Sequence, residues 1–445
     1  MPDDARANRI IGLLAMIGMW DVFGGLMHLN LMDGPVPIAV YGLAAVVLLT
    51  LAFTSSPRRW AWSGVWAVCG AVVGWVISWL VSDVWNSFDL TLSLPTRLWF
   101  TVSLAAAAVA IGSFYRRARW RKILAATAIP LFLLAGGIGI NADIGEFPVV
   151  GDIFGGSAIH ALILPSLEGV ASTKWVPPVD MPTRGQVGAV VIPATQSHFA
   201  ARKAVVYLPP AALVANAPAL PVLVMLAGQP GQPSNVITAG QLPLLANNYT
   251  KQHHGLAPIV VMPDQLGAPA NNPMCVDSPL GNSASYLTVD VPNWIHSHLR
   301  VRSGQAAWAI GGFSQGGTCS IQLGAKYPHI YGNIVDISGQ VIPHRGSTAA
   351  TVHDAFGGST ARYEAAAPLS LLAAGAPYPK TLAIFGVGAG DAKYMPAAAT
   401  VAHGAQAAGM DVHLFVSPGT AHDWHTVQYS LRKAFPLLGA RWGLK

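Results

Sequence analysis

Ser314 lies at the centre of the pentapeptide G-F-S-Q-G, residues 312–316, between two segments of different character. The apolar run Ala306–Ile310 before it is typical of a buried strand, and the residues from Gln315 onward are typical of a helix. A serine at such a junction indicates a nucleophile elbow, a tight turn that exposes the serine and strains its backbone. The flanking glycines are needed because a Cβ there would collide with the neighbouring strand and helix. The sequence therefore predicts that Ser314 is a catalytic nucleophile.

A carboxylate and a histidine follow Ser314 in the order that α/β-hydrolases use. Asp391 ends a glycine-rich turn after a strand predicted at 381–385, and His422 follows a strand predicted at 412–416. The histidine would take the proton of the serine, and the carboxylate would fix the imidazole tautomer and stabilise the imidazolium. The predicted triad is Ser314, His422 and Asp391.

Other residues compete for two of these roles. Asp336, at the end of a predicted strand, is an alternative acid, whereas Asp423 is too close in sequence to His422 to orient it. His425 is the rival base. A zinc site would need an HExxH or a Cys/His spacing, and neither pattern is present. We therefore expect neither a metal nor another cofactor.

Stabilising the oxyanion of the reaction requires two backbone N–H donors. One should be the N–H of Gln315, immediately after the nucleophile. The second should come from the loop at residues 227–231, where Pro230 has no N–H to give. Gln229 is the expected donor, and Gly228 is the alternative.

Two of the three cysteines lie in the second half of the chain. Cys275 and Cys319 could form a disulfide in an oxidising compartment, but two unrelated buried thiols fit the spacing equally well. Cys319 lies five residues after the nucleophile, and Cys275 follows a strand predicted at 258–262. We expect that strand to neighbour the elbow strand, which would bring the two cysteines together.

The elements that carry these residues alternate between strand and helix. Strands are predicted at 186–193, 204–208, 221–226, 258–262, 305–310, 332–337, 381–385 and 412–416. Helices are predicted at 287–299, 314–326, 397–408 and 426–435. A hairpin followed by alternating strands and helices favours an α/β domain with a mostly parallel sheet. This α/β-hydrolase domain is expected at residues 185–445, after a linker at 143–184.

Residues 1–142 have a different composition. Over the whole chain only 10% of residues are charged and 52% are hydrophobic, against about 25% and 45–50% in ordinary soluble domains. The apolar excess gathers in five stretches, 10–29, 37–53, 60–81, 98–115 and 123–140. A membrane-spanning helix needs about 20 such residues. We predict an α-helical transmembrane bundle of about five spans, or four if the first stretch, with Asp21 and His28, is interfacial.

Basic residues between the apolar stretches predict the orientation in the plasma membrane. Arg6 and Arg9 precede the first stretch, Arg58 and Arg59 separate the second and third, and the dense cluster at 116–122 separates the last two. With five spans all of them fall on the cytoplasmic side, so the catalytic domain lies outside the membrane. The same positions explain the net charge of +6 without nucleic-acid binding.

Five motifs together resemble the esterase D-like family of α/β-hydrolases, to which the mycolyltransferases of the actinobacterial envelope belong. They are L-A-G-Q-P-G at 226–231, C-V-D-S-P-L-G at 275–281, D-V-P-N-W at 290–294, G-G-F-S-Q-G-G-T-C at 311–319 and G-T-A-H-D-W at 419–424. The resemblance covers residues 185–440 and is strongest to a multi-spanning membrane branch. In the mycolyltransferases the acid is a glutamate, whereas Asp391 occupies that place here. They are also secreted, so mycolyl transfer to a sugar does not carry over.

The sequence thus predicts a membrane-anchored, extracytoplasmic serine esterase or acyltransferase. Its partners would be the lipid bilayer and an acyl-ester substrate of lipid or envelope origin, reached through an acyl-enzyme. An aminoacyl-lipid hydrolase or a peptidase of the same fold remains an alternative. So does a transporter or sensor in which a hydrolase-like domain only binds.

Overall fold

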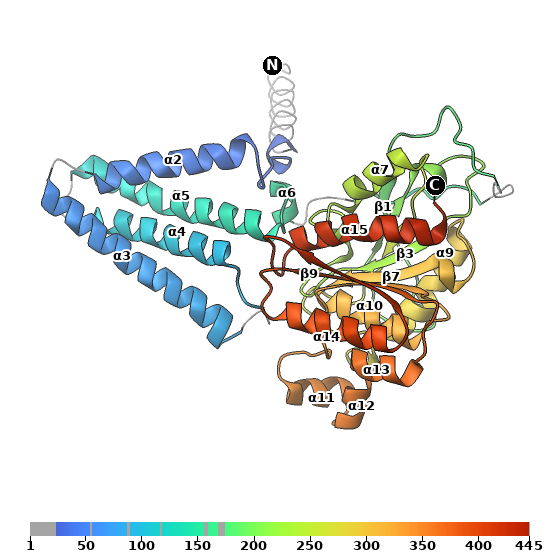
Figure 1. Cartoon of the computed structure of the whole chain (residues 1–445). Coiled ribbons are helices and arrows are strands. Elements are labelled where there is room, and N and C mark those ends of the chain that lie inside the picture. Colours follow the sequence, from blue (N-terminus) through green and yellow to red (C-terminus); the bar gives the residue numbers. More distant parts are fainter. Residues whose placement is uncertain are drawn as a thin grey trace, which may run out of the picture. The chain divides into compact units, whose positions relative to one another are not determined.

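The computed structural model describes residues 24–53, 56–86, 90–115, 118–154, 159–167 and 174–444 (Figure 1). The chain divides into two compact units, Met1–Ala158 and Ile159–Lys445.

The first unit contains long apolar helices. They are α2 (Pro35–Ala52), α3 (Pro57–Trp79, continued by the π-helical turn η1, Leu80–Val84), α4 (Leu94–Gly112) and α5 (Arg119–Ile144), followed by the short α6 (Val150–Ile153). Four segments are long and apolar enough to cross a membrane, with mean hydropathies from 1.5 to 2.2. They match four of the predicted stretches. The fifth predicted stretch, 10–29, falls mostly outside the described residues, as does Asp21, and the described residues contain four candidate spans.

Large and small side chains are distributed in this unit in the opposite way to a water-soluble bundle. Leu43, Val46 and Val68 are each more than half exposed. The buried positions of α3 are serine and glycine, Ser63, Gly70, Gly74 and Ser78, and those of α4 include three alanines and a glycine, Ala106, Ala107, Ala110 and Gly112. A Cβ on Gly70 would lie 2.6 Å from the carbonyl oxygen of Leu104, so α3 and α4 approach closely only because Gly70 lacks one.

The second unit is built on an eight-stranded sheet in the order β1-β2-β4-β3-β7-β8-β9-β10 (Figure 1). The strands are β1 (Gln186–Val190), β2 (Ala204–Leu208), β3 (Val222–Leu226), β4 (Ile259–Met262), β7 (Trp308–Phe313), β8 (Asn333–Ile337), β9 (Leu382–Gly388) and β10 (Asp411–Ser417). Strand β2 is antiparallel to β1 and β4, and all other pairs are parallel. The predicted α/β fold and all eight predicted strands are confirmed.

One predicted neighbour relation is wrong. Strand β4 does not lie beside the elbow strand β7, because β3 is inserted between them. A short hairpin, β5 (Asp277–Ser278) with β6 (Gly281–Asn282), was also not predicted. Chain order does not determine spatial order in a sheet with crossover connections, so the position of β4 could not be read from the sequence.

Helices cover both faces of the sheet, which explains why β2, β3, β4, β7, β8 and β9 are buried along their whole length. On one face lie α7 (Leu242–Gln252) and α15 (Trp424–Trp442); on the other lie α10 (Gln315–Lys326), α13 (Pro368–Gly375) and α14 (Tyr394–Ala407) (Figure 1). The remaining helices are α8 (Ser283–Ser285), α9 (Val291–His298), α11 (Thr348–Phe356) and α12 (Thr360–Ala365), with 3₁₀ turns at Pro210–Ala212, Pro233–Val236 and Gln305–Ala307 and a π-helical turn at Tyr286–Asp290.

The boundary between the units differs from the predicted linker at 143–184. Helix α5 continues to Ile144, and the described residues from 159 onward belong to the second unit. Ala161 pairs with Ala189 beside β1, and the indole N–H of Trp175 donates to the carbonyl oxygen of His254 at 2.9 Å. Much of this segment therefore packs on the second unit, although its Pro and Gly content is typical of a linker.

Candidate active site

Ser314 occupies the turn between β7, which ends at Phe313, and α10, which begins at Gln315. Its φ of +58° and ψ of −116° place it in a region that non-glycine residues rarely adopt. A Cβ on Gly312 would lie 2.3 Å from the carbonyl of Gly316, and one on Gly316 would lie 2.4 Å from the carbonyl oxygen of Ala227. The turn thus has the strained elbow geometry that the motif predicts.

The structure brings the three predicted triad residues together. The Nε2 atom of His422 lies 2.9 Å from Oγ of Ser314, and its Nδ1 atom lies 2.8 Å from Oδ2 of Asp391. The side chains of His422 and Asp391 are only 5% and 1% exposed. The backbone N–H of Tyr394 donates to the second carboxylate oxygen of Asp391 at 3.0 Å. Because a carboxylate faces Nδ1, this nitrogen carries the proton and Nε2 is free to accept the serine proton.

The surroundings of His422 restrict its ring to this position. The rings of Phe313 and Tyr394 lie 4.9 and 4.2 Å from the imidazole, centroid to centroid. Asp423, the neighbour of His422, instead caps α15 by accepting from the backbone N–H of Thr426 at 2.8 Å. The helix that follows the histidine therefore starts at a fixed point.

The alternative acid and base occupy other places. Asp336 is the penultimate residue of β8, and its burial raises its pKa to about 7, although the backbone N–H of Gly339 donates to it. His425 lies in the first turn of α15, whereas His422 is the histidine that reaches Ser314. Among the described residues, no three His, Cys, Asp or Glu side chains are grouped so as to hold a metal ion.

The expected oxyanion donors lie beside the nucleophile. Gln315 is the first residue of α10, so its backbone N–H has no acceptor within the helix. On the other side, a Cβ on Gly228 would lie only 3.5 Å from Cβ of Ser314, which places the loop at 227–231 against the elbow. Gln229 follows in this loop, and its side-chain amide donates to the carbonyl oxygen of Ala270 at 3.1 Å.

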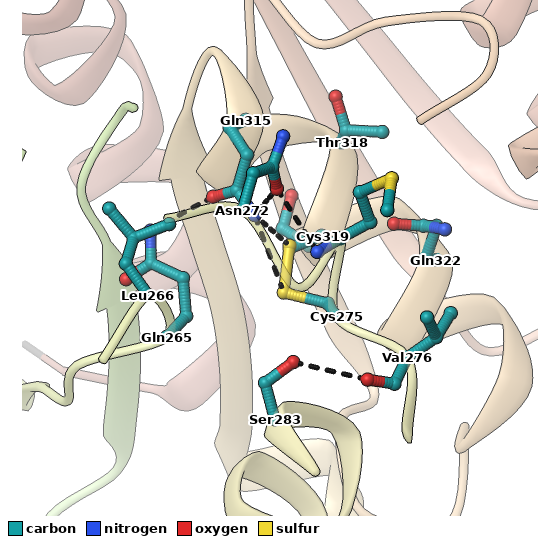
Figure 2. Close-up of a disulfide and its surroundings, with 12 residues drawn as sticks. Gln265, Leu266, Asn272, Cys275, Val276, Ser283, Gln315, Thr318, Cys319 and Gln322 are labelled. Carbon is teal, nitrogen blue, oxygen red and sulfur yellow. Dashed lines mark hydrogen bonds between the residues drawn. A yellow bond between two sulfur atoms is a disulfide. The ribbon is translucent and has the colours of Figure 1, made fainter. Parts of the chain in front are cut away.

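A buried network of the side-chain amides of Gln265, Gln315 and Asn272 lies behind these donors, and it was not predicted from the sequence. The Nε2 atom of Gln265 lies 2.7 Å from the carbonyl oxygen of Ala227 and 3.0 Å from Oε1 of Gln315. The Nε2 atom of Gln315 lies 3.1 Å from Oδ1 of Asn272 (Figure 2). Gln265 follows β4 by three residues at the carboxyl edge of the sheet. That position was the available signal, because polar side chains at this edge face the site of an α/β sheet.

The same network contacts a disulfide between Cys275 and Cys319, whose Cα atoms are 5.5 Å apart (Figure 2). Both cysteines are buried, and the amide nitrogen of Gln315 lies 3.2 Å from the sulfur of Cys319. The pair joins the long loop after β4 to α10, one helical turn after Gln315. The loop therefore reaches the elbow by crossing the end of β3, although β4 and β7 are not neighbours.

Solved structures with a similar fold are esterases and related hydrolases. A ferulic acid esterase aligns over 58% of this chain and 98% of its own, with 15% identity and a TM-score of 0.50. An S-formylglutathione hydrolase from Agrobacterium tumefaciens aligns over 59% of this chain and 97% of its own, with 20% identity and a TM-score of 0.48. At 15% identity the likeness to the ferulic acid esterase concerns the fold alone.

Sequence comparison identifies the family. An uncharacterized protein of Corynebacterium glutamicum is 32% identical over 282 residues, which cover 62% of this chain and 65% of the relative, less than two thirds of its length. Residues 197–431 match the model of the family described as "Putative esterase". This match includes every residue of the hydrogen-bonded triad. The chain therefore belongs to this esterase family.

Proposed function

We propose that the protein is a membrane-anchored serine esterase or acyltransferase. Its catalytic unit faces the outside of the plasma membrane and acts on acyl esters of lipid or cell-envelope molecules. The observation that carries the chemistry is the continuous hydrogen-bonded chain from Ser314 through His422 to Asp391.

The geometry of this chain supports a two-step acyl transfer. His422 takes the proton of Ser314 as Oγ attacks the ester carbonyl carbon, and Asp391 stabilises the imidazolium that forms. The backbone N–H of Gln315, with that of Gln229 or Gly228, binds the negative oxygen of the tetrahedral intermediate. His422 then protonates the leaving alcohol, which leaves the acyl group on Ser314. Water or an acceptor alcohol, deprotonated by His422, attacks the acyl-enzyme and restores the free serine.

Three observations support the anchor and its orientation. The first unit exposes large apolar side chains and buries small ones, which is how helices pack in a bilayer. Arg58 and Arg59 lie at the start of α3, and the turn that leads to α4 lies at the other end of that helix. The positive-inside rule assigns the end with the basic residues to the cytoplasmic side. The disulfide fits an oxidising compartment.

Replacing the nucleophile tests the proposed chemistry. The full chain with Ser314→Ala should lose p-nitrophenyl ester turnover by about 10⁴-fold or more, together with labelling by a fluorophosphonate probe. The matched control is Ser320→Ala, because Ser320 lies on α10 within two turns of the nucleophile but is buried and donates to the backbone carbonyls of Gly317 and Val335. Labelling retained in the Ser314→Ala protein at another serine would refute the assignment.

A further inference from the structure

We propose that Gln265 is a positioning residue that holds the two arms of the oxyanion hole at a fixed separation. The inference rests on the proposed function, because it concerns the transition state of that acyl transfer. One arm is the start of α10, which carries the N–H of Gln315. The other arm is the loop after β3, which carries the N–H groups of Gly228 and Gln229.

Gln265 is the side chain that contacts both arms. Its amide nitrogen donates to the carbonyl oxygen of Ala227 at 2.7 Å and to the side-chain oxygen of Gln315 at 3.0 Å. An amide nitrogen has two hydrogens, and these two acceptors use both of them. Gln265 is 1% exposed, so water does not replace either bond.

The bond to Ala227 fixes a donor on the first arm. The peptide between Ala227 and Gly228 is trans, so its carbonyl and its N–H point in opposite directions. Holding the carbonyl oxygen of Ala227 therefore sets the direction of the Gly228 N–H. The two arms also touch directly, since a Cβ on Gly316 would lie 2.4 Å from that same oxygen.

The bond to Gln315 fixes the second arm, and the rest of the network anchors it. The amide nitrogen of Gln315 donates to Oδ1 of Asn272, which also accepts from the backbone N–H of Met274 at 3.0 Å. The disulfide ties this loop to α10 at Cys319 (Figure 2). Gln315, the residue next to the nucleophile, is thus held by its side-chain hydrogen bonds as well as by the helix that it begins.

A side chain at position 265 must donate twice, because both of its partners are acceptors. Methionine has the length and shape of glutamine but no donor. Glutamate has the same shape, but when ionised it has only acceptor oxygens to place against two oxygens that are themselves acceptors. Both changes leave the buried carbonyl of Ala227 without its partner, and an unsatisfied buried carbonyl moves to find a new one.

The test compares Gln265→Met and Gln265→Glu in the full-length protein in detergent. We expect kcat for p-nitrophenyl butyrate to fall about 10- to 100-fold, less than the 10²–10³-fold typical of deleting a donor outright. KM should change less than about twofold, because the oxyanion forms only in the transition state. The affinity for an alkylboronic acid, which forms a tetrahedral adduct on the serine, should fall by the same factor as kcat/KM.

Gln322→Met is the matched control. Gln322 is also buried, lies on α10 and donates to one backbone carbonyl, that of Ala366 at 2.8 Å, but it does not contact either arm. The control should lower Tm as much as Gln265→Met without the loss in kcat. If Gln265→Met fails to fold, Gln265→Asn, which keeps the amide on a shorter side chain, should show the same selective loss of kcat and of boronate affinity.

Several outcomes would overturn the inference. They are unchanged kcat in both variants at position 265, an equal loss of kcat in the Gln322→Met control, or a loss of kcat without a loss of boronate affinity. Failure of the proposed function is distinguishable, because the wild-type protein would then neither hydrolyse the ester nor label at Ser314.

Discussion

Asp336 and Asp391 are buried aspartates at the carboxyl ends of the neighbouring strands β8 and β9: Asp336 is the penultimate residue of β8, and Asp391 follows β9 by three residues. Their environments differ. Asp391 accepts from His422 and from the backbone N–H of Tyr394, whereas one oxygen of Asp336 has no partner among the described residues. The sequence favoured Asp391 as the triad acid but did not exclude Asp336, because each of the two lies at or after the end of a predicted strand.

The two aspartates should respond differently to the same substitution. Asp391→Asn should lower kcat by about 10⁴-fold without unfolding the protein, because the amide leaves the imidazole in the wrong tautomer. Asp336→Asn should leave kcat within a few-fold of wild type. Ester hydrolysis at pH 8 by both purified variants measures this, and the opposite ranking would assign the acid to Asp336.

Asp336 should also make stability depend on pH. Burial raises its pKa to about 7, so the folded protein keeps a proton that the unfolded chain releases near pH 4. The free energy of unfolding therefore falls as pH rises between these values, by up to about 1.4 kcal/mol per pH unit, and is constant above them. The asparagine in Asp336→Asn does not titrate. The Tm of this variant minus the Tm of wild type should therefore increase as the pH is raised from 4 to 7. A constant difference in Tm would show that Asp336 is ionised throughout.

The sequence predicted each strand of the eight-stranded sheet but not their order within it. Continuous apolar runs such as Val222–Leu226 identify buried strands, because both of their faces must be covered. The insertion of β3 between β4 and β7 depends on packing between distant segments, and so does the contact of Gln265 with Gln315. The triad was predictable because its order and its position after strands are local features. The amide network was not, since it joins two loops and the start of α10, which are distant in sequence.

The link between the loop after β4 and α10 gives a prediction at the same scale. A non-reduced digest should contain one peptide pair joined through Cys275 and Cys319. The double variant Cys275→Ala/Cys319→Ala should lower the free energy of unfolding by about 2–4 kcal/mol, typical for removal of a native disulfide. Thermal unfolding of the full chain measures the loss as a lower Tm. Two free alkylated cysteines in the digest would refute the bridge.

For the whole molecule, the prediction concerns which side of the membrane each part faces. Alkaline phosphatase fused after residue 150 should be active, and the same reporter fused after Arg59 should be silent, because the enzyme folds only outside the cytoplasm. The expectation follows from the basic residues at 58–59 and 116–122. The reverse pattern would place the catalytic unit in the cytoplasm and exclude an envelope substrate.

In the proposed function, carrying the apolar helices and the catalytic unit on one chain also determines how often the enzyme meets a lipid ester in the same bilayer. An anchored enzyme and an ester-bearing lipid in the same bilayer search a surface, so their encounter rate depends on molecules per lipid rather than per litre. Detergent distributes the two among separate micelles, whereas a water-soluble ester is unaffected. Turnover of a lipid ester should therefore decrease as empty micelles are added, and rates measured in detergent understate the rate in a membrane.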